Sequence, residues 1–451
     1  MNIVTVLNVE IVSQSPIFIG DGLDLFLIDD ETGKAYLPAT SIAGSFRAYL
    51  KSIGENCNEL FGEQSQKGKP FMSKVFISDA FADINDIDRR TGLRIDPERG
   101  SNVDGSKISR CYLSPGLKFD LMFEIYSDNA EKNSRLLEML YKCLKALEKG
   151  YIRFGSNKSN GLGMFKISNP KETIFDLKDK VKWFEFLNND YSQFTDIYDR
   201  IKEMPMDTGY VAFNVEGEFS TPVLIKSPES AEDKGVDYKS IKSGNKYIVP
   251  GSSFKGVLRS RIEKVANYFG STNEAKALFG DYVSCYRKET NERNDKDKKK
   301  NKDNKNTLSR VFVSEAELSI DTKYQNKRYN RIRIDRFTGG VSKTALMSDI
   351  PIQGRTNFKV IFRKQQDKEK DDYAIGIIAL ALRDLGTENL VVGGGNGIGR
   401  GRFKANKMYI DDGNSVIEVD FNSKAVLKGE KLLDEYVSAV KSFMANKEGT
   451  I

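Results

Sequence analysis

The stretch Tyr247–Arg261 reads YIVPGSSFKGVLRSR, and a stretch of the same kind, Tyr36–Lys51, reads YLPATSIAGSFRAYLK. In both, a short apolar segment runs into a proline, hydroxyl residues follow, and apolar positions then recur at helical spacing. Serine and threonine are favoured at helix N-caps. Each stretch therefore predicts a strand end followed by a helix, and the likeness of the two indicates an internal repeat.

Five further matches follow the same order in both halves. They are Leu7–Ile19 with Phe213–Ile225, Leu60–Gly62 with Leu278–Gly280, Lys74–Ala80 with Arg310–Ala316, Arg94–Asp96 with Arg333–Asp335, and Phe154–Lys166 with Val392–Lys404. Six ordered matches are too many for local coincidence. The chain is therefore interpreted as one domain that has been duplicated and fused.

Periodicity predicts the same six elements in each half, in the order strand, helix, strand, strand, helix, strand. That order, βαββαβ, is the ferredoxin-like arrangement. We expect an α+β fold with two tandem ferredoxin-like (RRM-like) domains, at residues 1–170 and 208–451. Long inserts at 81–115 and 319–355 are expected to form functional or mobile thumbs or lids. The remaining expectations are a helical connector over 171–207 containing a helix at Val181–Met204, a disordered charged insert over 286–308, and a C-terminal helix at Ala425–Ala445.

Composition excludes several kinds of chemistry. The 451 residues include no histidine, which removes Ser-His-Asp and Cys-His catalysis and histidine-ligated metal sites. The four cysteines, at positions 57, 111, 143 and 285, have no CxxC spacing and are typical of reduced cytoplasmic thiols. We expect neither a signal peptide nor a membrane span. The net charge is +6, but four of these charges arise within residues 281–310, so the rest is nearly neutral.

Two glycine loops align without gaps. Gly155, Gly161 and Gly163 correspond to Gly393, Gly399 and Gly401, and Gly394, Gly395, Lys158 and Arg400 lie in the same loops. Glycine allows positive φ and a close approach of backbone amides to phosphate. A tight turn explains the spacing equally well. A dinucleotide site is disfavoured, because each loop follows a helix and precedes a strand.

The two predicted helix starts are candidate phosphate sites, because free amides at a helix N-terminus favour an anion. The second contains Ser252 and Ser253, with Lys255 and Arg259 one turn apart; the first contains Thr40, Ser41 and Arg47. An ordinary capped helix is the alternative. Ala43 stands where the second copy has Lys255, which predicts a weaker grip in the first copy.

Arginines flank the repeated Arg-Ile-Asp motif. They are Arg94 and Arg99 in the first copy and Arg331, Arg333 and Arg336 in the second. Alternating arginines on a strand suit a sugar-phosphate backbone. The alternative is a solvated face in which Asp96 or Asp335 forms an internal salt bridge.

One aspartate per copy, Asp24 in Gly-Leu-Asp and Asp237 in Gly-Val-Asp, lies in the loop before the helix motif. A loop carboxylate close to RNA can bind Mg²⁺ or orient a 2′-hydroxyl for in-line attack. By composition alone, each is more often a turn residue.

The combination of Tyr247–Arg259, Leu278–Gly280, Arg333–Gly339 and Gly393–Phe403 resembles the RAMP superfamily of CRISPR proteins, over nearly all of residues 1–410. Within it, the chain is most similar to the repeated backbone subunit of type III effector complexes, here as two copies in one polypeptide. The resemblance implies binding of a CRISPR guide RNA along a filament, pairing with a complementary target RNA, and neighbouring effector subunits. It also implies cleavage with Mg²⁺ or another divalent metal, with Asp24 and Asp237 at the position of the family's cutting aspartate.

Three other functions stay open: a non-catalytic guide-RNA scaffold, a guide-processing endonuclease, and a small-molecule nucleotide enzyme. Many guide-processing relatives rely on histidine, which this chain lacks. Metal-dependent cutting of target RNA separates the leading hypothesis from the scaffold.

Overall fold

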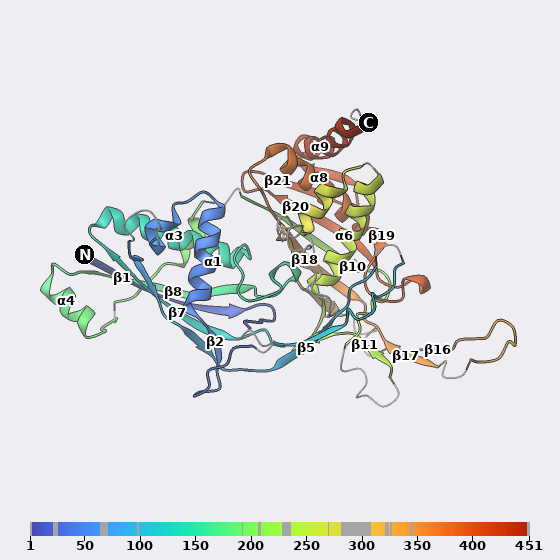
Figure 1. The fold of residues 1–451 in the computed structure, drawn as a ribbon, viewed down its shortest axis with the longest axis horizontal. Helices are drawn as coiled ribbons and strands as arrows, with labels where there is room; N and C mark the ends of the chain where they lie inside the picture. The colour runs from blue at the N-terminus through green and yellow to red at the C-terminus, as the bar shows by residue number, and fades with distance from the viewer. Residues whose placement is uncertain are drawn as a thin grey trace, which may run out of the picture.

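The computed structural model of the chain has an α+β fold with antiparallel sheets (Figure 1). It describes residues 2–20, 26–63, 71–96, 99–191, 193–205, 209–227, 236–268, 270–280, 308–320, 324, 327–342 and 346–448. The charged insert expected over 286–308 lies outside the described residues except for its last position. So does Asp24.

The first half builds a sheet in the order β3-β7-β1-β8-β9. Its strands and helices are β1 (Ile3–Ser13), β2 (Ala35–Leu37), α1 (Ala39–Ser52), α2 (Cys57–Phe61), β3 (Val75–Ile77), β4 (Ala80–Ala82), β7 (Lys118–Ser127), α3 (Ala130–Lys149), β8 (Phe165–Asp176) and β9 (Thr195–Asp196). The Asn-Val-Glu segment lies on the central strand, where Leu7 pairs with Phe123. All the pairings within this sheet are antiparallel.

The second half has four strands, β14, β18, β10 and β20, that repeat the order of β3, β7, β1 and β8 in the first half. Its elements are β10 (Tyr210–Phe219), β12 (Lys242–Ser243), β13 (Lys246–Val249), α6 (Gly251–Tyr268), α7 (Thr272–Phe279), β14 (Val311–Val313), β15 (Ala316–Ile320), β18 (Gly354–Arg363), α8 (Lys368–Gly386), β19 (Thr387–Val391), β20 (Arg402–Asp411), β21 (Val416–Asp420), β22 (Ala425–Lys428) and α9 (Glu430–Glu448). Phe213 pairs with Val360 as Leu7 pairs with Phe123. The duplication inferred from the sequence therefore appears again in strand order and register.

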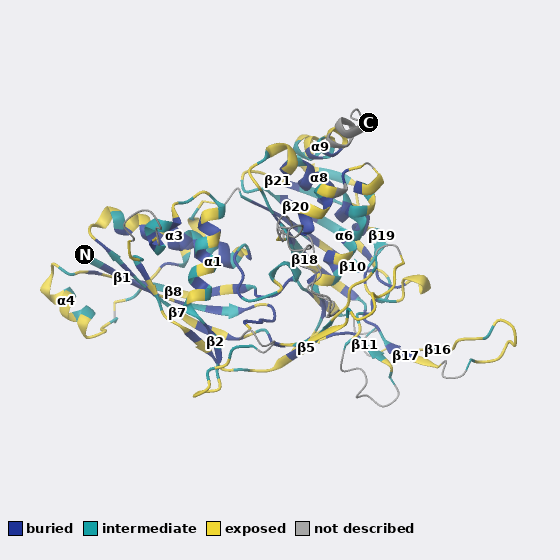
Figure 2. Cartoon of the chain, viewed as in Figure 1, coloured by how far each residue is buried: buried dark blue, intermediate teal, exposed yellow. Residues whose placement is uncertain are grey.

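Each core forms between a sheet and its helices. Along β1 and β10 the apolar side chains are buried, and α1, α3, α6 and α8 each bury an apolar face (Figure 2). Phe46 of α1 stacks beside Phe123 of β7, and both are fully buried. Truncating such a ring to alanine costs about 3–5 kcal/mol, because it leaves a cavity in the core.

The two halves share an apolar boundary. Tyr210 and Ile361, both from the second half, belong to the core of the first. The Tyr210 ring stacks on Tyr151 with 4.6 Å between ring centroids. The halves therefore pack against each other directly.

Each long insert forms a hairpin that extends from its sheet (Figure 1). In the first half, β5 (Ile87–Gly92) pairs with β6 (Ile108–Leu113) and reaches the second half. In the second half, β16 (Tyr329–Arg331) pairs with β17 (Met347–Ile350), and β11 (Tyr238–Lys239) adds a short parallel pairing to β17. Residues beyond β16 are mostly exposed (Figure 2).

The helical connector and the C-terminal helix differ from expectation. Strand β8 continues to Asp176, because Phe175 and its alternate neighbours are buried against the sheet. The predicted helix at Val181–Met204 is instead α4 (Lys180–Leu187), β9 and α5 (Tyr198–Glu203). Residues 425–428, expected to be helical, form β22, and α9 begins at Glu430 after a glycine with positive φ. Among the described residues, no helix is long and apolar enough to cross a membrane.

Candidate nucleic-acid interface

Lys255 lies in the second turn of α6, beside the contact of this helix with η1 of the first half, and is buried. Its side chain is only 8% exposed, and its Nζ donates to the Ser309 hydroxyl at 2.9 Å. Burial, helped by Arg259 and Arg153, lowers the pKa of Lys255 to about 7. The lysine expected to be a surface cation is therefore largely desolvated.

The start of α1 carries a carboxylate. Asp79 accepts the backbone N–H of Ala39 at 2.7 Å and the Tyr36 hydroxyl at 2.9 Å, which raises the pKa of Tyr36. The N-cap residue is Pro38, whose own side chain makes no capping hydrogen bond, so the cap comes from the distant Asp79. Thr40 and Ser41, like Ser252 and Ser253, lie inside the first helical turn, so the prediction that hydroxyls cap these helices is wrong for α1. A negative group at this end disfavours a phosphate there.

Arg47 and Arg259 share a structural role. Arg47 donates to the carbonyl oxygen of Gly62 at 2.6 Å and to Asn58 at 2.9 Å. Arg259 reaches the carbonyl oxygen of Gly280 at 3.5 Å. Both arginines thus hold the glycine of the repeated Leu-Phe-Gly motif, which explains why arginine and motif recur together.

Most of the repeated glycines are required by backbone packing. Gly155, Gly163, Gly393 and Gly401 have positive φ, and a Cβ on any of them would meet a backbone carbonyl oxygen. Gly395 is crowded by a side chain, that of Arg400, and Gly394 donates its N–H to the Leu224 carbonyl at 2.8 Å. Gly399 has positive φ but open space around it. The tight-turn alternative accounts for this spacing, and RNA contact at these loops stays a prediction.

The first glycine loop docks on the second half. A Cβ on Gly161 would lie 2.8 Å from the backbone nitrogen of Glu315, and one on Gly251 would lie 2.6 Å from the carbonyl oxygen of Asn160. The short 3₁₀ helix η1 (Lys158–Asn160) therefore packs between the start of α6 and β14. Lys158, half-buried, belongs to this contact.

Arg331 and Arg400 neutralise one buried carboxylate. Asp349 on β17 is fully buried; it accepts from Arg331 of β16 and, at 2.7 Å, from Arg400 of the second glycine loop. Arg400 also lies over the Tyr329 ring, 5.4 Å from its centroid. The internal salt-bridge alternative therefore describes Arg331, with Asp349 as the partner in place of Asp335, and Arg400 of the glycine loop shares that partner.

The other four motif arginines are exposed: Arg94 and Arg99 beyond β5, and Arg333 and Arg336 beyond β16. Asp335 is a turn residue, because its Oδ1 accepts the backbone N–H groups of Phe337 and Thr338, which lowers its pKa. The turn leaves Phe337 99% exposed beside the arginines. Exposed guanidinium groups and an exposed ring on a projecting hairpin fit contact with phosphates and bases.

Asp237 lies beside the Asp349 network. Its Oδ2 accepts the Ser348 N–H at 2.6 Å and its own N–H donates to the Ser348 carbonyl at 2.8 Å, while the residue is exposed. The structure thus brings Asp237 next to β17, the strand that carries Asp349. Arg331 and Arg400 are the partners of Asp349.

The described residues contain no cluster of three or more metal-ligating side chains. Mg²⁺ in nucleic-acid enzymes often takes one or two carboxylates and completes its shell with substrate phosphates and water. Asp237 fits such a shared site as the one protein carboxylate, and it does not form a cation site alone.

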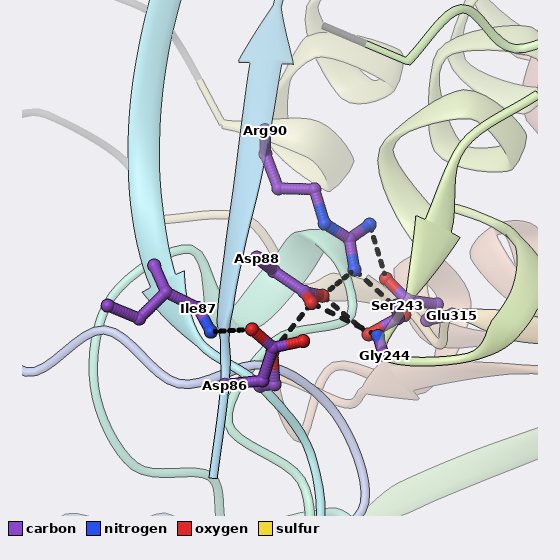
Figure 3. Close-up of polar contacts among 8 residues, drawn as sticks. Asp86, Ile87, Asp88, Arg90, Ser243, Gly244 and Glu315 are labelled. Atoms are coloured by element: carbon purple, nitrogen blue, oxygen red, sulfur yellow. Dashed lines mark hydrogen bonds and ion pairs between the residues drawn. The ribbon is translucent and has the colours of Figure 1, made fainter. Parts of the chain in front are cut away.

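A polar network ties the first hairpin to the second half (Figure 3). Arg90 of β5 lies between Asp88, at 2.8 Å, and Glu315, at 3.1 Å. Asp88 also accepts from the Ser243 hydroxyl at 2.6 Å and from the Gly244 N–H at 3.1 Å. Burial opposes ionisation of Asp88, yet these donors hold its pKa below the usual value; burial raises the pKa of Glu315.

Sequence reasoning missed Asp88, Arg90, Glu315 and Asp349, since the contacts of this group with distant segments form only through the fold. One signal was present: the second half has Lys327 and Tyr329 where the first has Asp88 and Arg90, relative to the Arg-Ile-Asp motif. That difference between otherwise matching copies marks residues with a role in one copy only.

Comparison with known proteins identifies one family. The sequence pattern described as RAMP superfamily matches residues 10–166 and again residues 217–404, more than half of the chain. One matched region lies in each half of the chain, so the family match repeats once for each of the two sheets. No curated protein matches the chain.

Proposed function

This chain belongs to the RAMP superfamily of CRISPR-associated, RNA-binding proteins, and from that premise we propose that it is a fused backbone subunit of a type III effector complex. Each half would be a ferredoxin-like domain that holds guide RNA and cuts the paired target RNA once. The observation that carries this proposal is the double family match over two sheets whose four core strands have the same order.

The projecting hairpins are the proposed contact with the RNA duplex. Arg333 and Arg336 are exposed beside Phe337, and Arg94 and Arg99 occupy the matching part of the first hairpin. Arginine contributes bidentate phosphate contacts, and an aromatic ring stacks on bases without regard to sequence. These groups would bind the guide–target pair through its backbone.

Asp237, with Asp24 as its counterpart, is the proposed cutting residue. Its carboxylate is exposed, and the hydrogen bond from Ser348 fixes its orientation. From there it would position the target's 2′-hydroxyl for attack on the adjacent phosphate, so that the 5′-oxygen of the next nucleotide leaves. A divalent metal shared between Asp237 and RNA phosphates would supply charge stabilisation for that displacement.

The scaffold alternative rests on the same hydrogen bond. A carboxylate that accepts a neighbouring strand's N–H performs an ordinary structural task, and Asp237 does this at 2.6 Å. In that case the chain would hold guide RNA without cutting. Neighbouring effector subunits and a cytoplasmic location belong to both versions of the proposal.

The test of RNA binding is salt dependence with the full chain and a labelled single-stranded RNA. Each phosphate that the protein no longer neutralises lowers the slope of log K against log salt by about 0.7. The double variant Arg333→Ala/Arg336→Ala is expected to flatten the slope by about 1.4. The matched control, Lys178→Ala/Lys180→Ala, removes two exposed cations at the opposite end of the molecule, beside α4 (Figure 1). Equal slopes for wild type and the arginine variant would exclude the hairpin as a phosphate contact.

A second experiment identifies the RNA. The complex is purified from its native host and its bound RNA is sequenced. Short RNAs that share a repeat-derived tag would support guide binding, and a random RNA population would contradict it.

A further inference from the structure

Asp237, the proposed cutting residue of the second half, takes its place from β17. Among the described residues its hydrogen bonds go to Ser348 alone: its N–H donates to the Ser348 carbonyl at 2.8 Å, and its Oδ2 accepts the Ser348 N–H at 2.6 Å. The short strand that follows, β11, pairs with β17 and with no other described strand. The position of the Asp237 carboxylate therefore depends on where β17 lies.

Asp349, the next residue of β17, fixes that strand between two other segments. It is fully buried, and its two carboxylate oxygens accept from different arginines. Arg331 belongs to β16, the partner strand in the hairpin, and Arg400 belongs to the second glycine loop, where its side chain is 7% exposed. A buried charge is costly unless it is paired. Asp349 therefore holds β17 at both arginines.

The second glycine loop is a firm attachment point for Arg400. The N–H of Gly394 donates to the Leu224 carbonyl at 2.8 Å, and the N–H of Gly401 donates to the Pro222 carbonyl at 3.0 Å. Both acceptors lie in the segment that follows the central strand β10. Arg400 thus ties β17, and with it Asp237, to the body of the second half.

Two other cations contact the residues around Asp237. Arg328 donates from Nε to the Ser348 hydroxyl at 2.6 Å, and Lys226 lies over the Tyr238 ring, 3.4 Å from its centroid. Both of these residues are exposed, so solvent weakens what their charges contribute. The fully buried Asp349 is the stronger constraint on β17.

The first half does not repeat these three residues. The bridge between Val223 and Ile352 corresponds to the bridge between Ile17 and Leu113, because Val223 and Ile17 are matching positions of the repeat. Counted from these bridges, from the hairpin pairings and from the aligned glycine loops, the first half has Arg110 for Asp349, Gly92 for Arg331 and Leu162 for Arg400.

Apolar packing fills the corresponding place in the first half. Phe18, Tyr112 and Leu162 form a small buried cluster there, and Arg110 lies over the Phe18 ring, 5.6 Å from its centroid. Apolar packing is non-directional, whereas hydrogen bonds between charged groups impose a geometry. The two halves therefore hold their hairpins by different chemistry, and the more directional one lies beside Asp237.

We propose that Asp349 is the positioning residue for Asp237: through Ser348 it fixes the carboxylate at the point where the second half cuts target RNA. The inference rests on the proposed cutting function and deepens it, because cutting by the second half then depends on a buried ion network that the matching residues of the first half do not form. Without the charge of Asp349, β17 is released from Arg400 and the Asp237 carboxylate shifts relative to the bound RNA. A misplacement of about 1 Å can slow a reaction by about 100-fold.

The test uses the complex assembled with guide RNA and an end-labelled target, under single-turnover conditions at a temperature where every variant is folded. Asp237→Ala first identifies the product made by the second half. Asp349→Asn is expected to slow that product by up to about 100-fold, while the other product and the affinity for target stay as in wild type. Asp349→Glu, which keeps the charge, is expected to recover part of the rate. The matched control is Asp434→Asn, the same chemical change at an exposed position of α9, which should cut like wild type.

The outcomes separate the two levels of the argument. If Asp237→Ala removes no product, the proposed cutting function fails and the positioning role fails with it. If Asp237→Ala removes one product, but Asp349→Asn slows both products equally, weakens target binding to the same extent or changes neither product, the positioning role is overturned while cutting stands.

Hydrogen exchange of the free chain tests the same link without the complex. The backbone amides of β17 are expected to exchange faster in Asp349→Asn than in wild type and in Asp434→Asn, because the strand has lost its buried attachment. Equal exchange of β17 in all three proteins would overturn the inference.

Discussion

Arg90 in the hairpin of the first half and Glu315 in the second half form an ion pair, with 3.1 Å between Nη1 and Oε2. Both side chains are about nine-tenths buried, and Asp88 shares the guanidinium. This pair sits between segments that lie 225 residues apart in the sequence. It fixes the first hairpin against the sheet of the second half, so the geometry of the hairpin depends on the boundary between the copies.

Breaking this pair from one side is expected to be costly. Arg90→Met leaves Glu315 and Asp88 buried without their cation, which costs about 3–5 kcal/mol for a buried pair. Urea denaturation measures the change in the free energy of unfolding. Arg89→Met, on the exposed face of the same strand, is the control and should change stability little. A loss of stability no larger than that of Arg89→Met would show that the network is not stabilising.

Asp88 predicts an acid-dependent loss of stability. Its folded pKa is below the usual value, so its contribution is present above the unfolded pKa and is lost as pH falls through the folded pKa. Asp88→Asn should therefore lower stability at neutral pH and weaken its dependence on pH in the acid range. Stability curves of wild type and variant at several acid pH values test this. Parallel curves would contradict the assigned role.

Asp349 is predicted to hold the second hairpin and the second glycine loop together. Asp349→Asn removes the negative charge from two arginines, one of which has its side chain about nine-tenths buried. Destabilisation of about 3–5 kcal/mol is expected for the broken buried pairs, by thermal or urea unfolding. The control is Asp335→Asn, which changes a carboxylate in a turn whose neighbouring residues are exposed. If both variants unfold at the same urea concentration, Asp349 does not stabilise this region.

The glycines of the loops predict unequal responses to alanine. In Gly163→Ala the new methyl group would overlap the Phe154 carbonyl, whereas Gly399→Ala meets only open space. Gly399→Ala therefore costs only the strain of positive φ, about 1–2 kcal/mol, and Gly163→Ala costs more. Melting temperatures of the two variants compare these costs. Equal melting temperatures would exclude close packing as the reason for Gly163.

Cutting by the assembled complex tests the catalytic part of the proposal. Asp237→Ala is expected to remove one product from an end-labelled target RNA, and Asp24→Ala another, with guide and target binding unchanged. Chelation of Mg²⁺ should remove both products, as expected for a metal shared with the RNA. Gel mapping of wild type, the two single variants and the double variant gives the result. A double variant that cuts like wild type would leave the scaffold version of the proposal.

Sequence alone determined the duplication and the order of the main elements, because repeated motifs and apolar periodicity are local properties of the chain. The predicted order of strand, helix, strand, strand, helix and strand is found as β1, α1, β3, β7, α3 and β8 in the first half, with shorter elements between them. The connector was predicted incorrectly: burial of Phe175 extends strand β8 into it as far as Asp176, and the single helix predicted at Val181–Met204 is divided into α4, β9 and α5.

The tertiary structure decided which charged residues are free to meet a ligand. Arg331, Arg333, Arg336 and Arg400 are equivalent in sequence as candidate RNA contacts, but only the fold places Asp349 beside Arg331 and Arg400 and leaves the other two exposed. It likewise buries Lys255 beside the contact between α6 and η1. Sequence patterns report the period and type of a residue, whereas burial and charge pairing depend on contacts between distant segments, and those contacts form only when the chain has folded.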